Sequence, residues 1–148
     1  MSRQPEVDEI ARRRELAERM GGPEKVARRH AAGRATVRER IDALADPGTF
    51  DEIGALAGTA SSVDGSLESF TPADFVLGTA RLDGRRVTIG ADDFTVRGGA
   101  ADAAIIEKQV YAERLANELG LPLVRLIEGT GGGDSVKLLD STGSRTSR

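Results

Sequence analysis

The pattern of apolar and polar residues in the second half of the chain predicts a strand hairpin, a helix and a further strand. Two strand-like segments flank Asp83-Gly84, a pair that closes tight β-hairpins. A long apolar-rich helix follows, and Gly120 separates it from one more apolar strand. The predicted strands span residues 75–82, 85–91 and 121–127, and the predicted helix spans residues 101–119. This order predicts a βαβ unit with two parallel strands, and therefore an α/β fold.

The long helix has apolar residues around much of its circumference. One stripe runs along the helix, and further apolar residues widen it. The stripe comprises Ala104, Tyr111, Leu115 and Leu119, and the residues beside it are Ile105, Ile106 and Val110. Because an amphipathic surface helix has a narrower apolar face, we expect this helix to be buried on several sides.

The first 48 residues predict three helices, over residues 5–20, over residues 24–32, and from Thr36 onward. Thr36 and Glu39 have the spacing of a capping box. The third helix is expected to turn a stripe toward the core, consisting of Val37, Ile41 and Leu44. The first two helices have too few apolar residues to form a core alone. They must therefore pack on the rest of the domain or on another subunit.

The remaining segments are less regular. Residues 50–60 fit no single element, and residues 61–71 are expected to form a polar loop with a turn at Asp64-Gly65. Residues 94–96 fit either the end of a strand or the turn after it. The chain is predicted to divide into a helical arm, a main domain and a disordered tail, over residues 1–48, 49–138 and 139–148.

Composition and charge narrow the function classes. The 148 residues include no cysteine and no apolar run of membrane-spanning length, so we expect a cytoplasmic protein that does not bind membranes. Residues 1–40 carry 11 Lys and Arg against 7 Asp and Glu, whereas residues 41–148 carry 10 against 17. The excess of positive charge in residues 1–40 could serve to bind an anionic ligand or partner, or it could simply belong to the solvent-exposed faces of helices. Nucleic acid is disfavoured because aromatic residues make up only 3%.

Two glycine clusters are the main candidates for a ligand site. Gly98-Gly99 and the cluster that begins Gly131-Gly132 each follow a predicted strand of the βαβ unit. Ligands bind at the carboxyl ends of strands in such sheets, and glycines let backbone N–H groups approach a ligand. Neither cluster matches a nucleotide-binding motif. From the residues alone, the two glycine clusters could be either structural turns or loops that face a ligand.

The charged side chains give weaker signals. Asp92 and Asp93 are adjacent, so on a strand they would point to opposite faces, and we expect them to stabilise a turn rather than share a substrate. His30 is the only histidine, which argues against a metal or triad site. Lys108 lies on the predicted helix and is expected to extend to solvent, pair with a carboxylate or contact a ligand. No catalytic side chain or metal ligand is predicted.

Two blocks of the sequence resemble carboxyltransferase (beta) subunits of biotin-dependent acyl-CoA carboxylases. The first block is residues 33–50, GRATVRERIDALADPGTF. The second block comprises Gly78, Asp83-Gly84-Arg85, Val87, Asp93-Phe94-Thr95-Val96, Gly98-Gly99 and Lys108. The blocks occur in the family's order, and the similarity extends from about residue 12 to residue 138.

The resemblance implies a crotonase-like spiral of βαβ units, incomplete here and preceded by N-terminal helices. It also implies transfer of a carboxyl group from carboxybiotin to the α-carbon of a short-chain acyl-CoA such as propionyl-CoA or acetyl-CoA. Backbone N–H groups would stabilise the enolate in that reaction. The implied ligand-binding residues are Gly98, Gly99, Ala100, Lys108, Gly131 and Gly132. The implied partners are a biotin carboxylase or biotin carrier subunit and further copies of the subunit.

The chain departs from the family pattern in two respects. The family's Asp-Ser-Gly-Gly-Ala-Arg motif corresponds to residues 128–133, EGTGGG, so that Gly133 replaces the arginine. Family subunits are also several times longer and contain a second crotonase-like half. We therefore expect the N-terminal piece of a carboxyltransferase subunit, inactive alone. The alternative is a non-catalytic binding or assembly module that docks on another carboxylase subunit.

Overall fold

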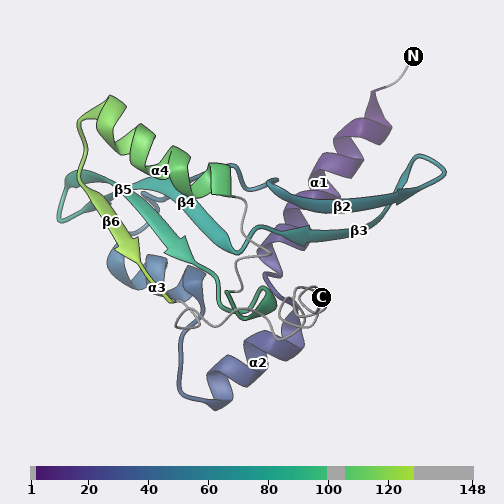
Figure 1. The fold of residues 1–148 in the computed structure, drawn as a ribbon, viewed down its shortest axis with the longest axis horizontal. Helices are drawn as coiled ribbons and strands as arrows, with labels where there is room; N and C mark the ends of the chain where they lie inside the picture. The colour runs from purple at the N-terminus through teal and green to yellow at the C-terminus, as the bar shows by residue number, and fades with distance from the viewer. Residues whose placement is uncertain (1–2, 100–105, 129–148) are drawn as a thin grey trace, which may run out of the picture.

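The helices of the N-terminal part lie close to their predicted positions. The structure, a computed structural model, describes residues 3–99 and 106–128. Its first three helices are α1 (Gln4–Glu18), α2 (Pro23–Ala31) and α3 (Val37–Leu44) (Figure 1). Within the described residues, no helix is both long enough and apolar enough to cross a lipid bilayer.

The predicted capping box at the start of α3 is confirmed. Glu39 N–H donates to Thr36 Oγ1 at 3.3 Å, and the Glu39 carboxylate accepts from Thr36 N–H at 2.7 Å. Val37 and Ile41 are buried as predicted. The prediction that Leu44 faces the core is wrong, because its side chain is exposed. The helix ends there, and the next apolar contact with the core comes from the following residue, where the chain is already extended.

The predicted hairpin and βαβ unit are both confirmed. The main sheet has the order β1-β4-β5-β6. Its strands are β1 (Asp51–Ile53), β4 (Phe75–Leu82), β5 (Arg85–Asp92) and β6 (Leu123–Leu126), and α4 (Ile106–Leu119) connects the last two. β4 pairs antiparallel with β1 and β5, whereas β6 runs parallel to β5. Gly120, with a φ of 60°, ends α4, and Leu121 N–H donates to Ala116 O there.

A second hairpin occupies the segment predicted to be a polar loop. β2 (Gly58–Val63) and β3 (Ser66–Pro72) pair antiparallel, and Asp64-Gly65 forms the turn between them. The turn prediction was therefore correct and the loop prediction was wrong. One side of the hairpin buries Leu67 and Phe70 against Ala17 of α1, while most of its other residues are exposed. Because the hairpin buries so few apolar residues, the composition of this segment resembles that of a loop.

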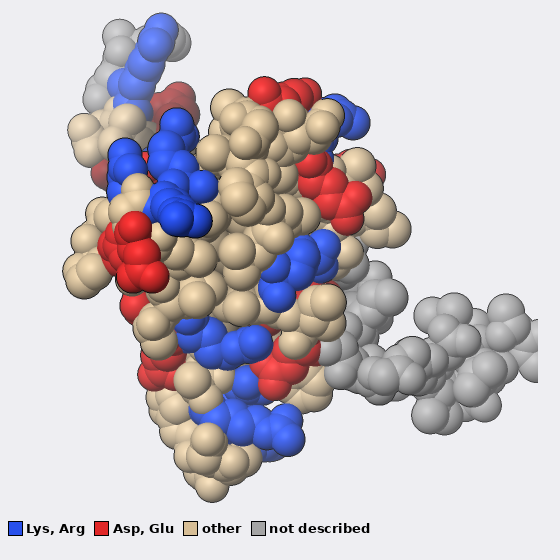
Figure 2. All heavy atoms as spheres, turned by 90° about the vertical axis from the view of Figure 1, so that its left-hand side faces the viewer, with Lys and Arg blue, Asp and Glu red and all other residues tan. Residues whose placement is uncertain are grey.

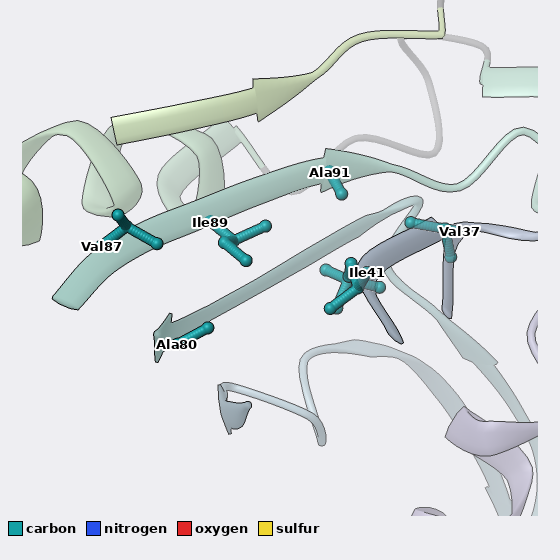
Figure 3. Packing of buried hydrophobic residues seen from close by; sticks show 7 residues of the cluster. Val37, Ile41, Ala80, Val87, Ile89 and Ala91 are labelled. Atoms are coloured by element: carbon teal, nitrogen blue, oxygen red, sulfur yellow. The ribbon is translucent and has the colours of Figure 1, made fainter. Parts of the chain in front are cut away.

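The main sheet is covered by helices on both faces, which confirms an α/β fold (Figure 1). Val37 and Ile41 of α3 form one buried cluster with Ala80 of β4 and with Val87, Ile89 and Ala91 of β5, and Figure 3 shows the two α3 residues at the Ala91 end of this cluster. On the opposite face, the buried cluster consists of Phe75, Leu77 and Ala112. Alternate residues of β4 thus face α3 and α4, as expected for a strand.

The prediction that α4 is buried on several sides is wrong for its described residues. Its buried apolar residues are Ala112, Leu115 and Ala116, which lie on one side of the helix. Its exposed large apolar residues are Ile106, Val110, Tyr111 and Leu119. Ala104 and Ile105, which were predicted to belong to the helix, lie outside the described residues. The main sheet packs against one side of α4 only, so it leaves the apolar residues on the other sides of the helix exposed.

Candidate functional site

Two segments leave the main sheet at the same edge. β5 and β6 are parallel neighbours, and Ala91 near the end of β5 pairs with Leu126 at the end of β6. The chain after β5 leads to Gly98 and Gly99, and the chain after β6 leads to Glu128. The structure thus brings together the strand ends that precede the two glycine clusters, as predicted. Ala100, Gly131 and Gly132 lie outside the described residues.

Asp92 and Asp93 stabilise the backbone at this edge, in line with their predicted turn role. Asp92 Oδ2 accepts a hydrogen bond from Glu128 N–H at 2.9 Å, so it joins the two strand ends. Asp93 is buried, and its Oδ1 accepts from Thr95 N–H at 2.9 Å and from Thr95 Oγ1 at 2.6 Å. Burial raises the pKa of Asp93, while the hydrogen bonds from Thr95 oppose that rise.

Residues 94–96 belong to the turn after β5, and Thr95 ties this turn to the N-terminal helices. Gly21 N–H, between α1 and α2, donates to Thr95 Oγ1 at 2.8 Å. A Cβ atom on Gly21 would lie only 1.9 Å from Thr95 O. Glycine is therefore required here, because any side chain would separate the helices from the turn.

The turn ends in two successive residues with left-handed backbone. Arg97 has a φ of 48° and Gly98 has a φ of 67°. Glycine adopts this conformation freely, whereas for arginine it costs about 1 kcal/mol. Residues held in this conformation often cluster at ligand sites.

Arg29 connects α2 to both segments that leave the sheet. Its side chain is buried, and its guanidinium donates to Glu128 Oε2 at 2.8 Å and to Ala35 O at 2.9 Å and 3.1 Å. The guanidinium also lies 5.7 Å from the centre of the Phe94 ring. The Glu128 carboxylate accepts further from Arg40 at 3.3 Å and lies 3.8 Å from Arg34. We call these three arginines and Glu128 the arginine cluster.

A groove of ≈ 460 Å³ lies between α2 and the turn after β5. Every charged residue that lines it is basic, and we call it the basic groove. These residues are Lys25, Arg28, Arg29, Arg34 and Arg97, and the other wall includes Phe94, Thr95 and Gly98. A second hollow of ≈ 310 Å³ shares Lys25 and Arg97 and extends to Leu16 and Phe70. Figure 2 shows several Lys and Arg groups at the lower end of the molecule, at the height of α2 in Figure 1.

Lys108 lies outside the basic groove. Lys108 is a residue of α4 and its side chain is buried, so that the charges of Glu52, Arg38 and Asp74 act on it. Arg38 and Glu52 pair through contacts of 2.8 Å and 3.3 Å. Burial lowers the pKa of Lys108, although Glu52 partly opposes this effect. Ligand binding by Lys108 stays a prediction.

His30 makes a local contact rather than facing the basic groove. Its Nε2 lies 3.0 Å from both carboxylate oxygens of Glu39. Hydrogen bonds from Thr36 N–H and from His30 lower the pKa of Glu39 to about 2. In the described parts of the chain, no three His, Asp or Glu side chains are placed to share a metal ion.

Sequence reasoning found the glycine turn but missed the basic groove and the arginine cluster. The excess of positive charge in residues 1–40 was the only signal of the groove. Nothing in the sequence indicated that Arg29 and Glu128, 99 positions apart, would form an ion pair. Such pairs depend on how the helices pack on the sheet.

Comparison with known proteins identifies the family. A model of the carboxyl transferase domain matches residues 28–144. The propionyl-CoA carboxylase carboxyltransferase subunit of Haloferax mediterranei is 36% identical over 132 residues, which are 88% of this chain and 26% of that protein. The methylmalonyl-CoA carboxyltransferase 12S subunit of Propionibacterium freudenreichii is 34% identical over 126 residues, which are 84% of this chain and 24% of that protein.

The fold agrees with these matches. The crystal structure of transcarboxylase 12S, a hexamer with methylmalonyl-coenzyme A and methylmalonic acid bound, aligns with a TM-score of 0.73 and 32% identity. The alignment covers 92% of this chain and 26% of that one. The chain spans about a quarter of the length of the curated relatives that it matches. It belongs to the carboxyl transferase domain family.

Proposed function

We propose that the chain is part of the carboxyltransferase component of a biotin-dependent acyl-CoA carboxylase. The component moves a carboxyl group from carboxybiotin, held on a separate carrier, to the α-carbon of a short-chain acyl-CoA such as propionyl-CoA or acetyl-CoA. It acts in the cytoplasm, as an oligomer, with a biotin carboxylase or biotin carrier subunit. The family match and the relatives named above support this proposal.

The basic groove is the observation that carries the proposal. Coenzyme A bears a 3′-phosphate and a diphosphate, and arginine side chains bind phosphate oxygens through paired, charge-assisted hydrogen bonds. Five basic side chains line the groove, and Gly98 lies in its wall. In our proposal, the nucleotide half of acyl-CoA binds in the basic groove while the thioester end extends toward the glycines.

In this proposal, the backbone that begins at Gly98, in the wall of the groove, supplies the reactive end of the site. We propose that Gly98, Gly99 and Ala100 offer backbone N–H groups to a thioester oxygen, which gains negative charge as the α-carbon loses its proton. Gly131, Gly132 and Lys108 complete the proposed contacts. The fold is crotonase-like in this proposal, with a helical arm over residues 1–48, a main domain over residues 49–138 and a tail over residues 139–148.

Binding of coenzyme A by the chain itself tests the proposal. We expect isothermal titration calorimetry to show binding that weakens with salt and that is stronger for coenzyme A than for dephospho-coenzyme A or pantetheine. Arg28→Glu should weaken binding by about tenfold, because one charge-assisted contact is lost. Arg86→Glu is the control, since Arg86 is exposed at the end of the β4–β5 hairpin, outside the groove.

Two results would contradict the proposal. One is that coenzyme A fails to bind, and the other is that Arg28→Glu and Arg86→Glu bind it equally well. Because the chain spans only about a quarter of the length of its relatives, we expect the chain alone to show no carboxyl transfer from carboxybiotin to propionyl-CoA. Turnover under these conditions would show that the described groove suffices for the reaction.

A further inference from the structure

Two successive hydrogen bonds connect the N-terminal helices to a buried carboxylate. Gly21 N–H, between α1 and α2, donates to Thr95 Oγ1 at 2.8 Å, and the Thr95 hydroxyl donates to Asp93 Oδ1 at 2.6 Å. A distance of 2.6 Å is typical of a hydroxyl that donates to an ionised carboxylate. In Figure 1, the turn after β5 accordingly lies beside the connection between α1 and α2. We call Gly21, Thr95 and Asp93 the threonine bridge.

The threonine bridge limits what Thr95 can do for a ligand. Thr95 lines the basic groove, but both of its donors, the N–H and the hydroxyl, already bond to Asp93 Oδ1. Because a hydroxyl has only one proton, Thr95 has no donor left for a phosphate. Thr95 can therefore serve an anion in the groove only indirectly, by holding α2 and the turn after β5 together.

Asp93 provides a fixed acceptor behind this wall of the groove. Its side chain is buried, and its N–H donates to Asp74 O at 2.7 Å, which anchors it to the residue that precedes β4. Burial raises the pKa of Asp93, whereas the hydrogen bonds from Thr95 oppose that rise. The charges of Arg38 and Arg29 oppose it as well, to a smaller extent. The Asp93 carboxylate and the Thr95 hydroxyl therefore stabilise each other.

We propose that Asp93 is a positioning residue of the basic groove, which acts through the Thr95 hydroxyl to hold α2 beside the turn after β5. The cations that α2 contributes to the groove are Lys25, Arg28 and Arg29. They bind an anion well only when they are already held in place. The inference rests on the proposed function, because it takes coenzyme A as the anion. It assigns part of the affinity to a buried carboxylate, although a negative charge by itself opposes anion binding.

Isothermal titration calorimetry with coenzyme A tests the proposal, because it measures the dissociation constant and the number of binding sites separately. Thr95→Val keeps the shape of the side chain but removes the hydroxyl, so the dissociation constant should rise by about tenfold. Thr95→Ser keeps the hydroxyl and should bind within about twofold of the original chain. Thr88→Val is the matched control, since Thr88 is also buried but its hydroxyl has no hydrogen-bond partner among the described residues. A merely structural role of Thr95 would lower the number of sites and leave the dissociation constant unchanged.

A double-mutant cycle tests whether the effect passes through the carboxylate. Asp93→Asn removes a negative charge, which by electrostatics alone would strengthen the binding of an anion. We expect weaker binding instead, because a neutral amide is a poorer acceptor for the Thr95 hydroxyl. The double variant Asp93→Asn/Thr95→Val should bind no more weakly than Thr95→Val alone, because both changes break the same contact.

Hydrogen exchange of the Gly21 amide separates this inference from the proposed function, because it needs no ligand. We expect its protection to fall by about tenfold in Thr95→Val and to stay unchanged in Thr88→Val. Should Thr95→Val fail to fold, Asp93→Asn is compared with Thr88→Val by the same two measurements.

The two readouts give distinct outcomes. If the original chain does not bind coenzyme A, the proposed function fails, and the Gly21 amide alone then decides whether the threonine bridge holds α2. Protection that Thr95→Val leaves unchanged would overturn the inference. Where coenzyme A binds, equal dissociation constants for Thr95→Val and Thr88→Val would overturn it too, and so would losses that add in the double variant.

Discussion

Replacing Glu128 by glutamine tests whether the arginine cluster holds the carboxyl edge of β6 to α2. Glu128→Gln keeps the size of the side chain and one acceptor oxygen, but it removes the negative charge. Arg29 then keeps its bonds to Ala35 O, while its charge stays buried without a carboxylate. Arg40 and Arg34 lose their shared counterion. We expect a clear loss of stability.

The magnitude follows from burial. Removing one partner of a fully buried ion pair costs about 3–5 kcal/mol. The side chain of Arg29 is 8% exposed and that of Glu128 is 20% exposed, so water partly screens this pair. Glutamine also keeps one hydrogen bond. We therefore expect the free energy of unfolding to fall by about 2 kcal/mol.

Urea denaturation followed by far-UV circular dichroism measures this loss. For a chain of this size the denaturant slope is about 2 kcal/mol per molar urea, so the midpoint should fall by about 1 M. Glu113→Gln is the matched control. The side chain of Glu113 is 68% exposed and lies 3.9 Å from Arg125, so this variant should change stability by less than about 0.5 kcal/mol.

Two results would refute this reasoning. One is a loss for Glu128→Gln that is as small as that of Glu113→Gln. The other is a loss that disappears in 0.5 M salt, because salt screens exposed pairs much more than buried ones. Either result would mean that the arginine cluster is a solvated surface contact.

Three further substitutions test other contacts by the same urea assay. Gly21→Ala should cost about 3 kcal/mol, because the new Cβ would lie 1.9 Å from Thr95 O and the helices would have to move. Thr36→Ala should cost about 1 kcal/mol through loss of the α3 cap, whereas Thr59→Ala on exposed β2 should cost less than about 0.5 kcal/mol. Lys108→Met should stabilise the chain at pH 7 by about 1 kcal/mol, because Arg38 still pairs with Glu52 after the buried amine is removed.

The Lys108 prediction has a pH dependence of defined sign. Burial lowers the pKa of Lys108, so between that pKa and 10.5 the unfolded chain binds more protons than the folded chain. Stability should therefore rise with pH in this window, and Lys108→Met should remove that rise. An advantage of Lys108→Met that stays constant up to pH 10 would contradict the buried position. For Gly21, a loss no larger than that of Gly65→Asn at an open turn would contradict the close packing.

Local signals in the sequence predicted much of the fold. The capping box of α3, the Asp83-Gly84 turn and the Gly120 cap each depend on residues a few positions apart. Such local rules can be applied without knowledge of the tertiary structure. The β2–β3 hairpin was missed because its burial depends on Leu67 and Phe70 reaching α1, about 50 positions earlier.

The exposure of the outer residues of α4 and the ion pairs of the arginine cluster could not be predicted for a related reason. An apolar pattern shows which residues favour burial, but it does not show whether anything in the chain covers them. Val110 and Leu115 are both apolar, yet only Leu115 is buried. Arg28 and Arg29 likewise look equivalent in the sequence, but only Arg29 is buried against Glu128.

The contacts of α2 make the N-terminal helices part of the proposed ligand surface. Gly21 N–H bonds to Thr95, and Arg29 bonds to Glu128, so two contacts hold α2 beside the segments that leave the sheet. The buried clusters of the main sheet contain no residue of α2. The sheet could therefore keep its core without this helix, but the basic groove could not exist. Since affinity for an anion depends on cations that are already held in place, these contacts preorganise the groove for a ligand.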